Sequence, residues 1–449
     1  MIAIVLYLLF IPDYFHFDIK VKALVTLLII QILWIGRVFP LAQSSILLIL
    51  ILSFHFFSYT ETLSYFGSDI VWLLFSTFII SHAFIKTGLA SRVSLKMLKL
   101  SKGSGKALIL ISYFLMFVLS IMIPSNVGKG SLVSSVFDSL LKSVEQIKSV
   151  KNLSKSLFIG ITYLTSISGA FVATGASSTI YAFGLIGDFS ADLNYLHWIY
   201  YFAPPIILFA IILWGLFLYI FPPENLDKYL LINLIEKKIQ ALGKISLAEK
   251  KIIFIICLTL LLWSTQQWHH LSIPLIGLLG ATLTFMPLVG VWKWEEAKTS
   301  IDWDMMLFFA STIMVSGMLI KTGTVDMVAT KLVSSIPTGS PFLVLLILIC
   351  FTVIFRIMFV NILGFLTIVL PLAITIGQSV PDLSPLIVTM AVFLAGIPGF
   401  LLITQSPVHL ITFSYRYYTE KDLLKVGGLS LLVWILIILL TATTYWIFI

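Results

Sequence analysis

Long apolar runs dominate this chain, and they restrict its fold before any motif is considered. Four of them approach or exceed the roughly 20 apolar residues that cross a bilayer; they span 107–123, 198–221, 271–291 and 427–449. The chain is 59% hydrophobic and 11% charged, whereas soluble domains carry about 25% charged residues. The runs are too many and too widely spread for a signal peptide. The sequence therefore predicts an all-α integral membrane protein that crosses the cell membrane many times.

Charge and motif content exclude several classes of function. The net charge of +8 is spread over loops rather than gathered in one tract, so we expect no nucleic-acid partner. Cys257 and Cys350 form no CxxC motif, and no HExxH motif or buried carboxylate pair is present. A P-loop for ATP is also missing from the sequence. We therefore expect neither an enzyme nor a bound cofactor.

The sequence repeats itself. The stretch "FIISHAFIKTG" at 78–88 resembles "IMVSGMLIKTG" at 313–323, which lies 235 residues later. The same offset places Ser125 and Asn126, within "PSNVGKG", on Val360 and Asn361. In both halves a polar residue interrupts two apolar runs. Two matches at one offset predict an internal duplication, which is common in secondary transporters.

The flanking charges give each interrupted segment an orientation. Both flanks of the first are rich in lysine, which is typical of the cytoplasmic side. The corresponding flanks in the second half carry no net positive charge. A segment with both flanks on one side has not crossed the membrane. We therefore predict two re-entrant hairpins that enter from opposite faces, an inverted repeat, with a cytoplasmic N-terminus and an extracellular C-terminus.

The predicted architecture has about eleven transmembrane helices and two hairpins. Its parts are scaffold helices at 1–69, a first repeat core at 70–221 with its hairpin at 107–142, a cytoplasmic linker at 222–251, scaffold helices at 252–303, and a second repeat core at 304–449 with its hairpin at 342–377.

The two hairpin tips can meet near the membrane midplane and form a polar site there. Helix N-termini at such tips favour anions, and two further helix breaks, "TGASST" and "TQSPVH", can add carbonyls and dipole ends. The candidate substrate-binding residues are Ser125, Asn126, Lys129, Asn361, Arg356, Ser177, Thr179, Ser406 and Pro407. Each also has a structural interpretation. The Ser and Asn residues can be helix caps, Lys129 can reach a wet vestibule, and Arg356 can hold carbonyls or an ion-pair partner.

These residues resemble the divalent anion:sodium symporter family. The resemblance rests on "FIKTGLASR", on "PSNVGKG" in place of the family's Ser-Asn-Thr signature, on "GASST", on "VWKWEEAKTSIDWDMMLFF" and on "YYTEKDLLKVG". It implies eleven spans and two hairpins whose tips bind sodium and substrate carboxylates, an elevator-type movement, and a homodimer. By the same resemblance, a sodium ion would be held by Ser125, Asn126 and Gly175.

The chain departs from the family signature in ways that bear on coupling. The first motif reads Ser125-Asn126-Val127 and the second Val360-Asn361-Ile362, so hydroxyl ligands for sodium are missing. Lys129 stands where family exchangers carry an arginine. We expect a secondary active transporter of small anions, di- or tricarboxylates or sulfate, that acts as an exchanger or a weakly sodium-coupled symporter. The alternative is a channel or pump-type permease for oxyanions that resembles the arsenite permeases.

Overall fold

The structure is a computed structural model that describes residues 2–12, 16–36, 38–190, 193–225, 227–335 and 340–448. All regular elements in these ranges are helices. Six are long and apolar enough to cross a membrane: α5 (Asp69–Lys86), α7 (Gly105–Met122), α11 (Tyr195–Ile220), α17 (Trp303–Lys321), α20 (Ile362–Ser379) and the C-terminal helix over Glu420–Phe448. Four shorter apolar helices accompany them: α3 (Leu41–His55), α15 (Ile273–Phe285), α19 (Pro341–Arg356) and α21 (Pro385–Gly396). The all-α membrane fold is confirmed, and the number of crossings stays a prediction.

The helices follow the same order in both halves of the chain. In the first half, α5 is followed by α6 (Leu89–Lys99), α7, α8 (Asn126–Glu145), α9 (Lys151–Gly169), α10 (Ser177–Gly187) and α11. In the second, α17 is followed by α18 (Thr324–Ser335), α19, α20, α21, α22 (Pro407–Ser414) and α23 (Glu420–Leu440). The first core is preceded by α1 (Ile2–Phe10), α2 (Ile19–Ile35), α3 and α4 (Tyr59–Ser64). The second core is preceded by α13 (Leu247–Ser264), α14 (Gln266–His269), α15 and α16 (Trp294–Ala297). The linker forms α12 (Lys228–Ala241).

Two ion pairs display the duplication at the level of single residues. Lys86 at the end of α5 pairs with Glu296 at 2.6 Å, and Lys321 at the end of α17 pairs with Glu61. The two lysines are 235 positions apart, as are the two glutamates. Each half therefore supplies the partner of the other half's lysine, and α5 packs on α15 as α17 packs on α3. The symmetry is the informative feature, because pairs so exposed to solvent add little to stability.

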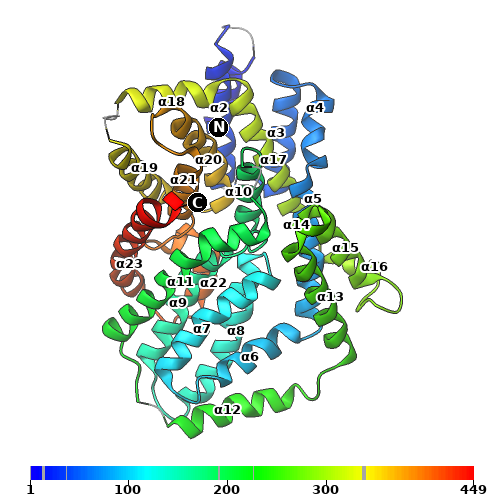
Figure 1. Ribbon diagram of the computed structural model, residues 1–449, viewed down its shortest axis with the longest axis vertical. Helices are drawn as coiled ribbons and strands as arrows, with labels where there is room; N and C mark the ends of the chain where they lie inside the picture. Colours follow the sequence, from blue (N-terminus) through cyan, green and yellow to red (C-terminus); the bar gives the residue numbers. More distant parts are fainter. Residues whose placement is uncertain are drawn as a thin grey trace.

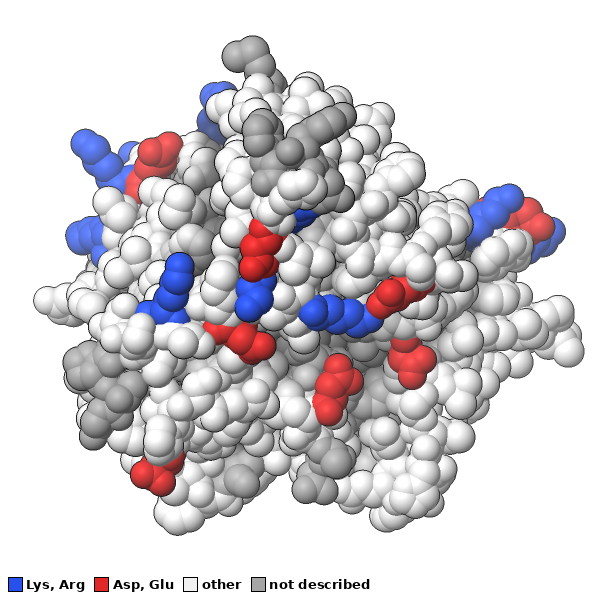
Figure 2. All heavy atoms as spheres, turned by 90° about the horizontal axis from the view of Figure 1, so that it is seen from above, with Lys and Arg blue, Asp and Glu red and all other residues white. Residues whose placement is uncertain are grey.

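Two short amphipathic helices, α6 and α18, follow the repeated Lys-Thr-Gly motifs. Gly88 and Gly323 precede them with φ of 83° and 68°, a left-handed conformation that suits glycine and reverses the chain direction. Figure 1 places α6 and α12 at the lower end of the molecule and α18 at the upper end. The repeats therefore send corresponding helices to opposite ends. Seen from the α18 end, basic and acidic side chains are interspersed (Figure 2), which agrees with flanks that carry no net positive charge.

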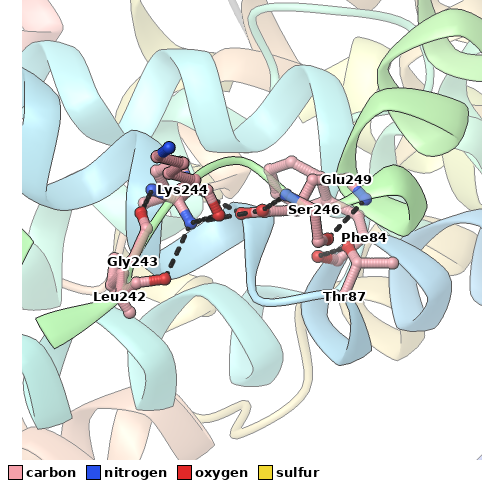
Figure 3. A network of polar contacts seen from close by, with 8 residues as sticks. Phe84, Thr87, Leu242, Gly243, Lys244, Ser246 and Glu249 are labelled. Atoms are coloured by element: carbon pink, nitrogen blue, oxygen red, sulfur yellow. Dashed lines mark hydrogen bonds and ion pairs between the residues drawn. The ribbon is translucent and has the colours of Figure 1, made fainter.

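A buried ion pair fastens α6 to the first turn of α13, with further contacts to the segment before that helix (Figure 3). Arg92 on α6 donates from Nε to Glu249 at 2.5 Å and from Nη1 to the carbonyl of Gly243 at 2.9 Å. The backbone N–H of Ser246 also donates to Glu249, at 2.7 Å. Both charged side chains are less than a tenth exposed. We call this contact between Arg92 and residues 242–249 the linker latch.

Candidate functional site

The first hairpin turns at Pro124, between the end of α7 at Met122 and the start of α8 at Asn126. Ser125 caps α8, because its hydroxyl oxygen accepts from the N–H of Gly128 at 3.1 Å. The expectation that Asn126 caps this helix is wrong. The Oδ1 atom of Asn126 is buried and has no hydrogen-bond partner among the described residues. An unpaired buried acceptor carries a cost of about 1–3 kcal/mol, so Asn126 is free to bind a ligand or an ion.

The second hairpin turns between Arg356, where α19 ends, and Ile362, where α20 begins. Here the asparagine is the cap, as the sequence predicts. Oδ1 of Asn361 accepts from the N–H groups of Leu363 at 2.9 Å and Gly364 at 3.4 Å. The two tips therefore present the start of a helix in the same way but use different residues to cap it.

Both predicted helix breaks are present. The first separates α9, which ends at Gly169, from α10, which begins at Ser177; Thr179 bridges it by donating to the Gly169 carbonyl at 2.8 Å. The second separates α21 from α22, where Ser406 is the cap and Pro407 takes the first helical position. Proline suits that position because its missing N–H would have no helical partner.

The tips and the breaks surround one cavity of about 220 Å³, which we call the central cavity. The candidate residues that line it are Ser125, Asn126, Ser177, Asn361, Ser406 and Pro407. Four segments that are far apart in the sequence thus contribute to a single site. Gly130 serves this assembly rather than a ligand, because a Cβ there would lie 2.7 Å from Val408 of α22. The absence of a side chain lets α8 and α22 pack closely.

Lys129 does not line the central cavity. It lies one turn behind Ser125 on α8 and is fully buried. Its Nζ donates to the Ser120 hydroxyl at 2.7 Å and to the Gly175 carbonyl at 2.9 Å. The ammonium therefore binds the carbonyl that the family resemblance assigns to sodium, and it connects the first hairpin to the first helix break.

Arg356 has a similar environment in the second half. It is 1% exposed, and its guanidinium donates to three backbone carbonyls: Gly396 at 3.0 Å, Gln405 at 2.9 Å and Phe359. It therefore connects the second hairpin to the second helix break and does not line the cavity. Among the described residues, neither Arg356 nor Lys129 has a carboxylate within ion-pair distance.

One cavity residue escaped the sequence argument. Asp302 is not among the candidate residues from the sequence; it caps α17 by accepting from the N–H of Met305 at 2.9 Å. It also lines the central cavity, and among the residues that the structure describes it is the only carboxylate there. The sequence could not predict this position, because Asp302 reaches the cavity through packing between the two halves and no local sequence pattern indicates such packing.

Comparison with known proteins identifies the family of this chain. The model of the sodium:sulfate symporter transmembrane region matches residues 1–449. The chain belongs to this family. The sodium-dependent dicarboxylate transporter SdcS of Staphylococcus saprophyticus is 24% identical over 445 residues, covering 94% of this chain and 85% of the relative. The citrate/succinate antiporter of Escherichia coli K12 is 22% identical over 385 residues, covering 84% and 78%.

A third relative and one solved structure complete the comparisons. The L-tartrate/succinate antiporter of Escherichia coli K12 is 22% identical over 394 residues, covering 86% of this chain and 80% of the relative. The solved structure of the YdaH transporter of Alcanivorax borkumensis superposes with a TM-score of 0.51 at 14% identity, covering 87% of this chain and 88% of that one. At that identity the structural likeness concerns the fold alone.

Proposed function

We propose that this protein is a secondary active transporter of small dianions, with dicarboxylates as the first choice of substrate. The observation that carries the proposal is the pair of buried cations behind the hairpin tips. Lys129 and Arg356 are held by carbonyls and hydroxyls, without a neutralising carboxylate among the described residues. An anionic substrate in the central cavity would offset these two charges, beside the Asp302 carboxylate that lines the same cavity. Relatives named as dicarboxylate, citrate/succinate and tartrate/succinate transporters support this substrate class.

The substrate would meet polar groups rather than the cations themselves. Asn126, Asn361 and the serines at the cavity supply amide and hydroxyl groups, and the starts of α8 and α20 point partial positive charge toward it. The buried cations act over a short distance, since Lys129 is only about 6 Å along the helix from Ser125. In a site shielded from water, such charges interact strongly with an anion.

The same arrangement favours exchange over sodium symport. The Gly175 carbonyl, a candidate sodium ligand, already accepts from Lys129. The second motif offers no hydroxyl at Val360 or Ile362. A tethered cation cannot leave with the substrate, so the empty site would keep its uncompensated charge. Release should be fastest when another anion takes the place of the first. Alternating access by an elevator-type movement of the hairpin cores, in a homodimer in the cell membrane, completes the proposal.

Uptake by the full chain in proteoliposomes tests the proposed substrate class. Vesicles loaded with unlabelled succinate should take up labelled succinate, and external malate or tartrate should compete. Empty vesicles without protein are the control. Competition by sulfate or arsenite but not by any dicarboxylate would contradict the proposal and favour an oxyanion permease.

A further inference from the structure

A second, larger cavity of about 440 Å³ lies beside the central one, between the second hairpin and the scaffold. Its walls come from the end of α2, the start of α3, Phe308 on α17 and the tip residues 359–361. It shares Val360, Asn361 and Pro407 with the central cavity, so the two meet at the second hairpin tip. We call it the side cavity.

Most of the side cavity's lining is apolar, but two polar side chains stand in it without partners. Gln31 is 8% exposed and Trp34 is 7% exposed. Neither Nε2 of Gln31 nor Nε1 of Trp34 has a hydrogen-bond partner among the described residues. Buried N–H groups in folded proteins are nearly always paired, because an unpaired one gives up its hydrogen bond to water without a replacement.

The other half of the molecule provides an internal comparison. Trp263 is the second-to-last residue of α13, as Trp34 is of α2, and it lines a small cavity beside the first hairpin. Its Nε1 donates to the Ile273 carbonyl at 3.0 Å. Leu260 stands three residues before it, where Gln31 precedes Trp34. The corresponding space beside the first hairpin measures only about 20 Å³. The architecture therefore requires neither the space nor the two unpaired donors of the side cavity.

We propose that the side cavity binds the acyl substituent of a substituted dicarboxylate. The two carboxylates lie in the central cavity, and the hydrocarbon part of the substituent fills the apolar walls. The substituent's carbonyl oxygen accepts from Trp34 and Gln31. This inference rests on the proposed function and extends it. It predicts that the protein binds substituted dicarboxylates larger than succinate more tightly than succinate itself.

The volume and the chemistry of the cavity fit such a ligand. Pockets for small organic molecules measure about 300–1,000 Å³ and combine apolar walls with a few placed polar groups. The polar groups here are donors, which select an acceptor such as a carbonyl oxygen. Phe308 and Phe359 offer ring surfaces for an aromatic or branched hydrocarbon group.

Three ligands separate the parts of the proposal in binding measurements on the reconstituted full chain. Succinate reports on the central cavity, 2-benzylsuccinate adds hydrocarbon alone, and 2-benzoylsuccinate adds hydrocarbon and a carbonyl. We expect the benzyl compound to bind more tightly than succinate, and the benzoyl compound to bind about tenfold more tightly than the benzyl one, as for a net hydrogen bond.

Variants assign the gain to the side cavity. Trp34→Phe removes the N–H but keeps an aromatic ring, so it should remove the benzoyl advantage and leave succinate binding unchanged. Leu41→Trp should fill the cavity and remove both gains. Trp72→Phe is the matched control, because Trp72 is 47% exposed and lines neither cavity.

The outcomes distinguish this inference from the proposed function. Binding of succinate with no further gain for either larger ligand would overturn the side-cavity proposal alone. A benzoyl advantage that survives in Trp34→Phe would also overturn it, as would a gain from hydrocarbon only, which is what a site for a lipid chain would give. Failure of all three ligands to bind would overturn both proposals.

Discussion

Lys129 and Arg356 make similar contacts, although they do not occupy equivalent positions in the two repeats. Lys129 lies in the second arm of its hairpin and Arg356 in the first arm of the other. Each donates to a carbonyl at the helix break of its own half, Gly175 or Gln405. A buried charge without a counter-ion costs several kcal/mol. On the proposed function, an anionic substrate would offset that cost, which would tie the residues to binding more than to folding.

Replacing Lys129 with methionine separates these two contributions. The variant keeps a similar volume and removes the buried charge, so we expect its melting temperature to hold or rise while succinate affinity falls at least about tenfold. Added sodium should restore part of the affinity, because it can then reach the Gly175 carbonyl. Isothermal titration and thermal unfolding measure the two effects.

The matched control for this variant is Lys142→Met. Lys142 lies on the same helix but is 69% exposed and pairs with Asp138 at 2.8 Å. It should alter neither affinity nor sodium response. An unchanged affinity in Lys129→Met would refute the role of the buried cation, and a large loss of stability would make that lysine a structural residue.

At the scale of single elements, the linker latch joins α6 to the start of the second half. The latch consists of a buried ion pair between Arg92 and Glu249. In the neighbouring ion pair, the side chains of Lys99 and Glu236 are 48% and 38% exposed. Both pairs link α6 to the linker region, so they form a natural comparison of a buried and an exposed contact on one helix.

Neutralising the buried carboxylate should destabilise the protein far more than neutralising the exposed one. We expect Glu249→Gln to lower the free energy of unfolding by about 2 kcal/mol, since it leaves a buried guanidinium without its counter-charge. Glu236→Gln should cost at most about 0.5 kcal/mol. Thermal unfolding in lipid nanodiscs checks both, and equal effects would contradict the latch.

The latch also predicts a pH dependence. The hydrogen bond from Arg92 is the main cause that lowers the pKa of Glu249. A carboxyl whose folded pKa is depressed stabilises the fold above its unfolded pKa of about 4.3 and loses that contribution as the pH falls through the folded value. The stability difference between wild type and Glu249→Gln should therefore stay constant from about pH 8 to pH 5 and shrink below about pH 4.

The hairpins and helix breaks could be read from the sequence, because a polar residue inside an apolar run has few physical explanations. Asn361 and Pro407 gave such signals, and both stand where a helix begins. Helices α6 and α18 escaped, since their lysines resemble a loop; only the spacing of Leu89, Leu95 and Leu98 marks the buried face of α6. Cavity residues such as Asp302 and Trp34 also escaped, because long-range packing places them there.

For the molecule as a whole, the inverted repeat explains why two hairpins meet at one cavity. The exchanged ion pairs of Lys86 with Glu296 and Lys321 with Glu61 relate the halves by an approximate two-fold arrangement. With α6 and α18 at opposite ends (Figure 1), each hairpin reaches the centre from its own side. The membrane orientation of these ends remains a prediction from the flanking charges.

Cysteine labelling in cells tests that orientation. In a chain with both native cysteines replaced by serine, cysteines at the exposed positions Lys102 and Ser149 should react only from the cytoplasm. Cysteines at the exposed positions Ser335 and Ser379 should react only from outside. Labelling of Lys102 and Ser149 from opposite faces would show that the first hairpin crosses the membrane.

The central claim is that Lys129 and Arg356 replace bound sodium, and counterflow in proteoliposomes tests it most directly. Labelled succinate uptake is measured with and without internal succinate, over a series of sodium concentrations balanced with choline. The account predicts strong stimulation by internal succinate and little change with sodium. A steep, saturable dependence on sodium, without stimulation by internal substrate, would contradict it.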